Sequence, residues 1–214
     1  MADGALIAIL AMRYWGQPSQ QRGEEARMIG NTSDGWGWPA STFHWVIAGM
    51  VLVQFGFGLW MSDVPLRSER AFYYGIHASI GISILALMVL RLAWRLMNKV
   101  PTEPAGMPDW EKLAARAAHW LLYAVTFAAV LAGWMLAGSH RTPVDVKMFG
   151  FIDMPQLVAA GSPLHEPLEE VHELLAFTLI ALVTLHTAAA LWHHFGRQDD
   201  VLMRMVSRKA KQGT

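Results

Sequence analysis

The sequence predicts an all-α integral membrane protein folded as a four-helix bundle. Hydrophobic residues make up 54% of the 214 residues and charged residues only 16%, well below the roughly 25% of a soluble domain. Four runs contain no Asp, Glu, Lys or Arg: 43–62, 71–90, 117–140 and 174–194. Each is close to the 20 or so residues that a helix needs to cross a hydrocarbon layer of about 30 Å, so each predicts one membrane span.

The segments between these runs set the expected boundaries. Residues 1–41 are largely polar and predict a flexible N-terminal tail, and the prolines of 98–110 break the helical pattern. The third and fourth spans are joined by a long loop of the kind that forms lids or docking surfaces. We expect one membrane domain over 42–206 and a basic tail at 207–214. The helices are expected at about 42–61, 70–97, 111–137 and 168–195.

Lysine and arginine are divided unevenly between the two sides of the membrane. Four spans put thirteen of them on the side of the termini and four on the other side, namely Arg67, Arg70, Arg141 and Lys147. Because positive residues accumulate in cytoplasmic segments, both termini are expected to be cytoplasmic. The opposite, outer side carries eight acidic residues and is therefore net negative.

The chain has no cysteine but nine histidines. The absence of cysteine excludes disulfides, thiolate metal sites and covalent attachment of a c-type haem. Two histidines, His172 and His186, lie 14 residues apart in the fourth span, which is just under four turns and about 21 Å along one helix face. Ionisable groups inside a membrane indicate function, and two histidines at two depths of one helix suggest ligands for two stacked haems.

The predicted topology assigns histidines to two depths. His77 and His172 both lie near the outer face, whereas His44 and His186 both lie toward the inner face. Each pair would fill both axial positions of a haem iron, an arrangement that favours electron transfer over oxygen binding. His119 also lies on the inner side and is an alternative ligand there, or a partner for a haem propionate or quinone. Arg91 is a further candidate for the inner propionate, because a guanidinium suits a carboxylate.

Several segments then resemble the bacterial cytochrome b561 family of small four-helix, di-haem membrane proteins. They are FHWVI at 43–47, GIHASIGISILALMVLRLAWRL at 75–96, HW..Y from 119, MFGFIDMP at 148–155 and HELLAFTLIALVTLHTAAALWHHF at 172–195. The resemblance covers about 42–206. It implies two non-covalent b haems held by His44, His77, His172 and His186, a location in the bacterial inner membrane, and an activity like that of a superoxide:ubiquinone oxidoreductase.

The resulting expectation is an electron carrier that oxidises superoxide at the periplasmic side and reduces ubiquinone. Arg141 and Lys147 would steer superoxide locally, against the net negative outer face. The alternative is a cytochrome b anchor that relays electrons between quinone and a periplasmic redox protein docked on the long loop. A haem-free transporter or structural membrane protein is a third possibility. The expected partners are membrane lipid, ubiquinone and superoxide, and nucleic acid is not among them.

Overall fold

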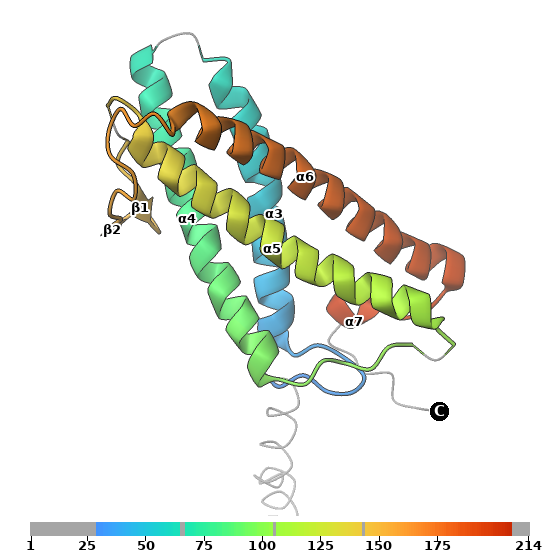
Figure 1. The fold of residues 1–214 in the computed structure, drawn as a ribbon. Helices are drawn as coiled ribbons and strands as arrows, with labels where there is room; N and C mark the ends of the chain where they lie inside the picture. Colours follow the sequence, from blue (N-terminus) through green and yellow to red (C-terminus); the bar gives the residue numbers. More distant parts are fainter. Residues whose placement is uncertain (1–28, 65–66, 105, 143, 207–214) are drawn as a thin grey trace, which may run out of the picture.

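Four long helices dominate the computed structural model, which describes residues 29–206 except 65–66, 105 and 143. They are α3 (Trp38–Ser62), α4 (Arg67–Met97), α5 (Asp109–Ser139) and α6 (His165–Leu191) (Figure 1). All four are long and apolar enough to cross a membrane. The prediction of an all-helical membrane protein with four spans is therefore confirmed.

All four helices begin earlier than predicted, the first three as follows. Helix α3 starts at Trp38 rather than at 42, with Pro39 in its first turn, where proline needs no backbone donor and has a suitable φ angle. Helix α5 starts at Asp109 rather than 111 and ends at Ser139 rather than 137. Helix α4 likewise starts at Arg67 rather than 70. Charged residues are tolerated in these end turns because the turns lie outside the apolar layer.

The last span differs from the prediction at both ends. Helix α6 begins at His165 instead of 168 and continues beyond Leu191 as the π-helix η1 (Trp192–Arg197). Gln198 then ends the helix in a left-handed conformation, with φ of 55°. Within η1, His193 pairs with Asp199, with 2.5 Å between Nδ1 and Oδ2.

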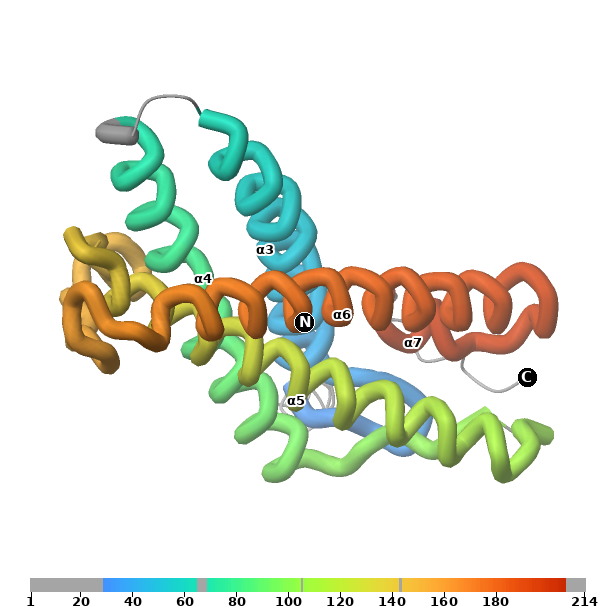
Figure 2. Tube along the Cα trace, turned by 45° about the horizontal axis from the view of Figure 1, so that its top comes forward, coloured from blue at the N-terminus to red at the C-terminus, as the bar shows by residue number. Residues whose placement is uncertain are grey.

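The helices are arranged as two pairs that cross each other. Helix α3 packs on α4 and α5 packs on α6, while α4 also contacts α5 and α3 touches α6 only slightly. Figure 2 shows α5 and α6 side by side, with α3 and α4 crossing them. One buried cluster, Ile47, Ile84, Met88 and Tyr123, joins α3, α4 and α5. A second joins Ile82 of α4 and Ala137 of α5 to Val146 of the following loop.

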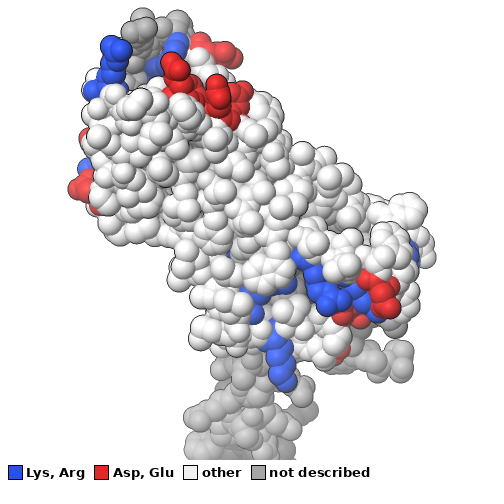
Figure 3. Space-filling view, viewed as in Figure 1, with Lys and Arg blue, Asp and Glu red and all other residues white. Residues whose placement is uncertain are grey.

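Charge is concentrated at the two ends of the molecule. Figure 3 shows Lys, Arg, Asp and Glu at both ends, with an uncharged belt between them. Helices α3 and α6 expose most of the apolar surface of their spans, whereas α5 is the most buried. This distribution suits a bundle whose central surface faces lipid.

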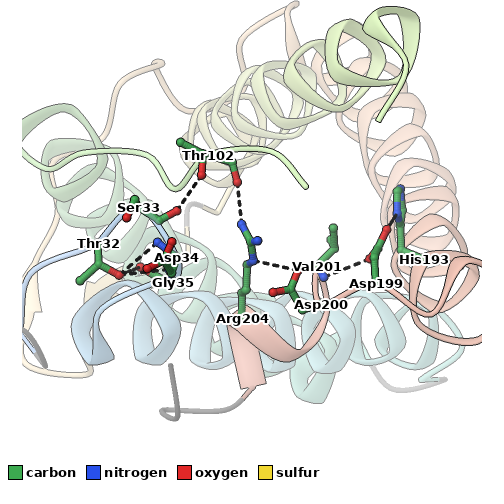
Figure 4. A network of polar contacts seen from close by, with 10 residues as sticks. All are labelled: Thr32, Ser33, Asp34, Gly35, Thr102, His193, Asp199, Asp200, Val201 and Arg204. Atoms are coloured by element: carbon green, nitrogen blue, oxygen red, sulfur yellow. Dashed lines mark hydrogen bonds and ion pairs between the residues drawn. The ribbon is translucent and has the colours of Figure 1, made fainter. Parts of the chain in front are cut away.

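The end of the bundle that carries both described termini is held together by hydrogen bonds (Figure 4). The backbone N–H of Thr102 donates to Ser33 O at 2.9 Å, and Arg204 donates to Thr102 O at 2.6 Å. Trp45 donates to the carbonyl of Met205 at 3.1 Å, beside the short helix α7 (Met203–Val206). Residues 29–37, which belong to the predicted tail, are thus held against the bundle. Residues 1–28 and the basic tail at 207–214 lie outside the described residues.

At the opposite end, which the predicted topology places on the outer side and which is called the outer end below, the loop after α5 forms a small antiparallel hairpin. Strand β1 (Lys147–Met148) pairs with β2 (Ile152–Asp153), with Lys147 opposite Asp153. The hairpin packs on the side of α4 (Figure 1).

Candidate functional site

Two of the predicted histidines face each other near the outer end. His77 of α4 and His172 of α6 have ring centroids 6.1 Å apart, with planes at 89°. Two imidazole nitrogens on opposite sides of one metal ion lie about 4 Å apart, because each bond is about 2 Å, and this places the centroids about 6 Å apart. The separation therefore fits two axial ligands of one iron.

The His172 ring is oriented by the backbone of α5. Its Nδ1 lies 2.8 Å from the carbonyl oxygen of Ala129, and only a protonated Nδ1 can donate to that acceptor. The other nitrogen, Nε2, is then unprotonated and suited to bind a metal. A hydrogen bond of this kind fixes both the tautomer and the ring orientation of histidine ligands.

Two glycines make room for these rings. A Cβ on Gly133 of α5 would stand 2.8 Å from Cε1 of His172, and one on Gly58 of α3 would stand 3.1 Å from Cε1 of His77. Any larger residue would push the imidazoles from their positions. The Nδ1 of His77 is buried without a hydrogen-bond partner among the described residues, so packing contacts hold this ring in position.

A cavity of about 340 Å³ surrounds the outer pair, within the range of about 300–1,000 Å³ that is usual for cofactor sites. Apolar groups from all four long helices line it, including Phe55, Ile84, Val130 and Phe177. Glu169, Glu173 and His140 line it at the outer end. The donor set and the apolar walls would fit a haem held by these two histidines.

Three histidines meet toward the other end of the bundle. His44 of α3 lies opposite His186 of α6, with ring centroids 6.3 Å apart and planes at 73°. His119 of α5 is closer to His186, at 5.3 Å, which is shorter than two opposite ligands of one metal require. The Nδ1 of His44 is buried and has no hydrogen-bond partner in the described part of the chain. The His44–His186 separation thus matches that of the outer pair, whereas His119–His186 does not.

Arg91 of α4, the predicted partner of an inner propionate, is half-buried. Its guanidinium carbon lies 5.8 Å from the ring centroid of Tyr123, a distance at which a cation and an aromatic ring attract each other. No group of three or more His, Asp or Glu side chains among the described residues is arranged to hold a metal ion. The inner histidines therefore do not form a three-ligand metal centre.

The two predicted steering residues differ in their surroundings. Lys147 forms an ion pair with Asp153 across the hairpin, with 3.1 Å between Nζ and Oδ1. Arg141 is exposed in the loop after α5. The charge of Lys147 is thus largely compensated, and Arg141 is the better candidate to attract an anion.

His140 and His165 pack on each other with ring centroids 4.5 Å apart. His165 begins α6, where its Nδ1 lies 2.9 Å from the hydroxyl of the buried Ser139. Burial, and to a smaller extent the neighbouring His165, lowers the pKa of His140. Because α6 starts three residues earlier than predicted, this end of the loop packs on the end of α5.

Sequence reasoning also missed the two glycines beside the outer histidines. An isolated glycine inside a helical pattern indicates a close approach of another group, and Gly133 stands alone among apolar residues. That signal does not say which group approaches, so only the packing of α5 on α6 connects Gly133 with His172.

Known proteins with similar sequences include bacterial cytochromes. Residues 35–208 match the family model described as prokaryotic cytochrome b561. The chain is 32% identical over 183 residues to cytochrome b561 homolog 2 of Escherichia coli, covering 84% of this chain and 95% of that protein. It is 30% identical over 168 residues to the probable superoxide oxidase CybB of Yersinia pestis, covering 78% and 92%. It is 28% identical over 170 residues to cytochrome b562 of Cereibacter sphaeroides, covering 77% and 90%.

Proposed function

The chain belongs to the prokaryotic cytochrome b561 family and is a membrane cytochrome, and we propose that it binds two b haems. One would be held by His77 and His172, the other by His44 and His186. The observation that carries this proposal is that the ring centroids are nearly equally far apart within the two pairs, at 6.1 Å and 6.3 Å. Their positions on α6 differ by 14 residues, or about 21 Å.

When bound, the two haems would supply one-electron carriers at both ends of the bundle. The residues of the chain determine how these carriers behave. Two histidines holding each haem would leave its iron no position for a further ligand, which favours electron transfer over ligand binding. The bond from His172 Nδ1 to Ala129 O makes this imidazole a more basic ligand and holds its angle. Arg91 would favour a carboxylate, such as a propionate, at the inner end, with His119 as a second candidate beside it.

We further propose that superoxide is oxidised at the outer end and ubiquinone is reduced in the membrane. The relative named probable superoxide oxidase, at 30% identity, supports the donor. Two superoxide ions would each lose one electron and leave as O₂, while ubiquinone would gain both electrons and two protons. The excess of Lys and Arg on the side of the termini supports an inner-membrane orientation with both termini in the cytoplasm.

A second candidate function is supported by the charge around the outer cavity. Glu169 and Glu173 line its mouth, and neither is paired with a described Lys or Arg. An acidic mouth repels superoxide at long range but attracts a partner with a basic face. Here the protein would be a membrane anchor that exchanges electrons between quinone and a periplasmic redox protein.

Haem quantitation and reduced-minus-oxidised spectra would test the two-haem proposal. We expect two low-spin b haems in the wild type and one in each of His77→Ala and His186→Ala. His194→Ala, in η1 beyond α6 and outside both pairs, should retain two. One haem in the wild type, or no loss from either pair variant, would refute the assignment. Reduction of a ubiquinone analogue by enzymatically generated superoxide would then distinguish the two functions, since the anchor requires a protein donor.

A further inference from the structure

The hairpin of the long loop lies against α4 in a way that the proposed electron transfer does not explain. The backbone N–H of Lys147 donates to Ser79 Oγ at 2.9 Å, and that of Phe149 donates to Ser83 Oγ at 2.8 Å. Ser83 is only 5% exposed. Residues 144–153, here called the outer wedge, are therefore fixed along the side of a membrane-spanning helix and not above its end.

The depth of the outer wedge follows from the histidine pair. His172 faces His77 and directly precedes Glu173, the last charged residue before the apolar run of α6. The level of His77 thus marks the edge of the uncharged belt. Ser79 and Ser83 follow His77 by two and six residues on α4, which is about 3 Å and 9 Å further into that belt.

The side chains of the outer wedge change from charged to apolar in the same direction. The Lys147–Asp153 ion pair lies at the level of Ser79, while the turn at the level of Ser83 carries Phe149 and Phe151. These two phenylalanines are 47% and 74% exposed, and neighbouring Ile152 is 40% exposed. A surface segment in water would leave these groups solvated at considerable cost, whereas lipid accommodates them.

The backbone N–H groups at the tip of the wedge are hydrogen-bonded within the protein, as a lipid environment requires of polar groups. Gly150 N–H donates to Lys147 O at 3.0 Å, Phe151 N–H to Met148 O at 3.3 Å, and Met154 N–H to Val146 O at 2.9 Å. The two serine hydroxyls accept from Lys147 and Phe149. The left-handed turn at Phe149 and Gly150, with φ of 53° and 82°, closes this tip without an exposed donor.

An open groove between the wedge and α4 continues the same surface. Met50, Phe72, Ile76, Ile80 and Phe149 line it. Asp145 and Lys147 also line it, and Lys147 is paired with Asp153, so the groove has no net positive charge that would select an anionic head group. Its chemistry fits the acyl chains of lipid.

We propose that the outer wedge inserts into the lipid leaflet at its end of the bundle, with Phe149 and Phe151 among the acyl chains. The insertion anchors this part of the loop beside the outer histidine pair. It leaves only the remainder of the loop, with Arg141, facing water at the mouth of the cavity. The proposal depends on the membrane fold and not on the number of haems or the electron donor.

Site-directed spin labelling tests this directly, because the chain has no cysteine of its own. Full-length Phe151→Cys and Phe149→Cys would carry a nitroxide in phospholipid nanodiscs, and collisions with O₂ and with a water-soluble nickel chelate would be compared. Val53→Cys on α3, 66% exposed in the apolar belt, is the lipid control. Asp63→Cys, exposed after α3, is the water control. Unchanged haem content would show that each variant is folded.

We expect both wedge labels to match Val53→Cys, with more O₂ than nickel collisions, at a depth of about 5–10 Å below the head groups. Nickel collisions as frequent as at Asp63→Cys would overturn the proposal. Labels shielded from both agents would also overturn it, since a protein partner or a second copy would then cover the wedge.

Discussion

The substitution Gly133→Ala tests whether the outer histidines act as a fitted pair. The added Cβ would stand 2.8 Å from Cε1 and 3.0 Å from Nδ1 of His172, whereas ordinary contact begins at 3.4 Å. The ring would therefore have to move by about 0.6 Å. That movement stretches the 2.8 Å hydrogen bond from Nδ1 to Ala129 O beyond the usual limit of about 3.2 Å.

Loss of this hydrogen bond from a buried donor is worth about 1–3 kcal/mol. The same free energy corresponds to between fivefold and about 150-fold weaker binding at the outer site. Purified Gly133→Ala is therefore expected to lose the outer haem selectively, and its haem content should fall from two per chain toward one. The inner haem should remain, because His44 and His186 lie about 21 Å away along α6.

Two other glycines provide a graded comparison. Gly58→Ala would place its Cβ 3.1 Å from His77, while nothing lies within 4 Å of a Cβ on Gly56. We expect a smaller haem loss from Gly58→Ala and none from Gly56→Ala, in which alanine also has the higher helix propensity. Full haem content in Gly133→Ala, or equal loss from all three variants, would refute the argument from ring position.

Three further predictions concern other residues toward the two ends of the helix bundle. Arg141→Glu should slow superoxide oxidation about fourfold at low salt, because a change of two charges at roughly 10 Å in water is worth about 0.8 kcal/mol; the effect should fade at high salt. Lys147→Glu should matter less, and equal slowing at both salt concentrations would contradict the steering role. His119→Ala should retain two haems by quantitation, since the 5.3 Å between the rings of His119 and His186 is too short for two opposite ligands of one metal. Loss of a haem would instead identify His119 as a ligand. Burial lowers the pKa of His140 below its usual 6.5, so the unfolded chain gains a proton first as the pH falls through that value. Stability is therefore lost as the pH falls below about 6.5. Between about pH 7 and pH 5 the apparent thermal midpoint should decrease less in His140→Gln than in the wild type; equal decreases would contradict this.

The membrane spans were predictable because lipid imposes a length on any helix that crosses it. The ends of the helices were less predictable, since charged residues are compatible with a helix outside the lipid. Pro39 could have placed the start of α3 earlier, because proline is common in first turns. The π-helix at Trp192–Arg197 has no comparable signal, because it depends on hydrogen bonds that shift by one residue.

The two histidine pairs could be predicted from helix rise and topology alone. A fixed rise per residue puts His172 and His186 at two depths, and alternating helix direction assigns His77 and His44 to the same depths. Helix rise cannot distinguish His44 from His119 as the neighbour of His186, since both lie in the inner part of their helices. The difference between 6.3 Å and 5.3 Å arises from how α3 and α5 pack on α6.

The path of the outer wedge was not predictable from the sequence. Ser79 and Ser83 are unremarkable in an apolar helix, where a serine usually bonds to its own helix backbone, as Ser83 does with Ser79 O at 2.8 Å. Their second role, as acceptors for the loop backbone, requires a loop that turns back 66 residues later in the chain. A loop of this length was expected to be a lid or docking surface, but contacts so distant in sequence leave no periodic pattern.

The outer wedge and the acidic mouth of the cavity together restrict the directions from which an electron donor can approach the outer histidines. Lipid would cover one side of the loop, and Glu169 and Glu173 line the cavity mouth, so an anion must approach past Arg141. Screening of the acidic residues should then speed the reaction of wild-type protein with superoxide as salt increases. A basic protein donor should show the opposite dependence, because salt weakens its attraction to the same carboxylates. The sign of the salt dependence therefore separates the two proposed functions, even where both donors reduce the protein.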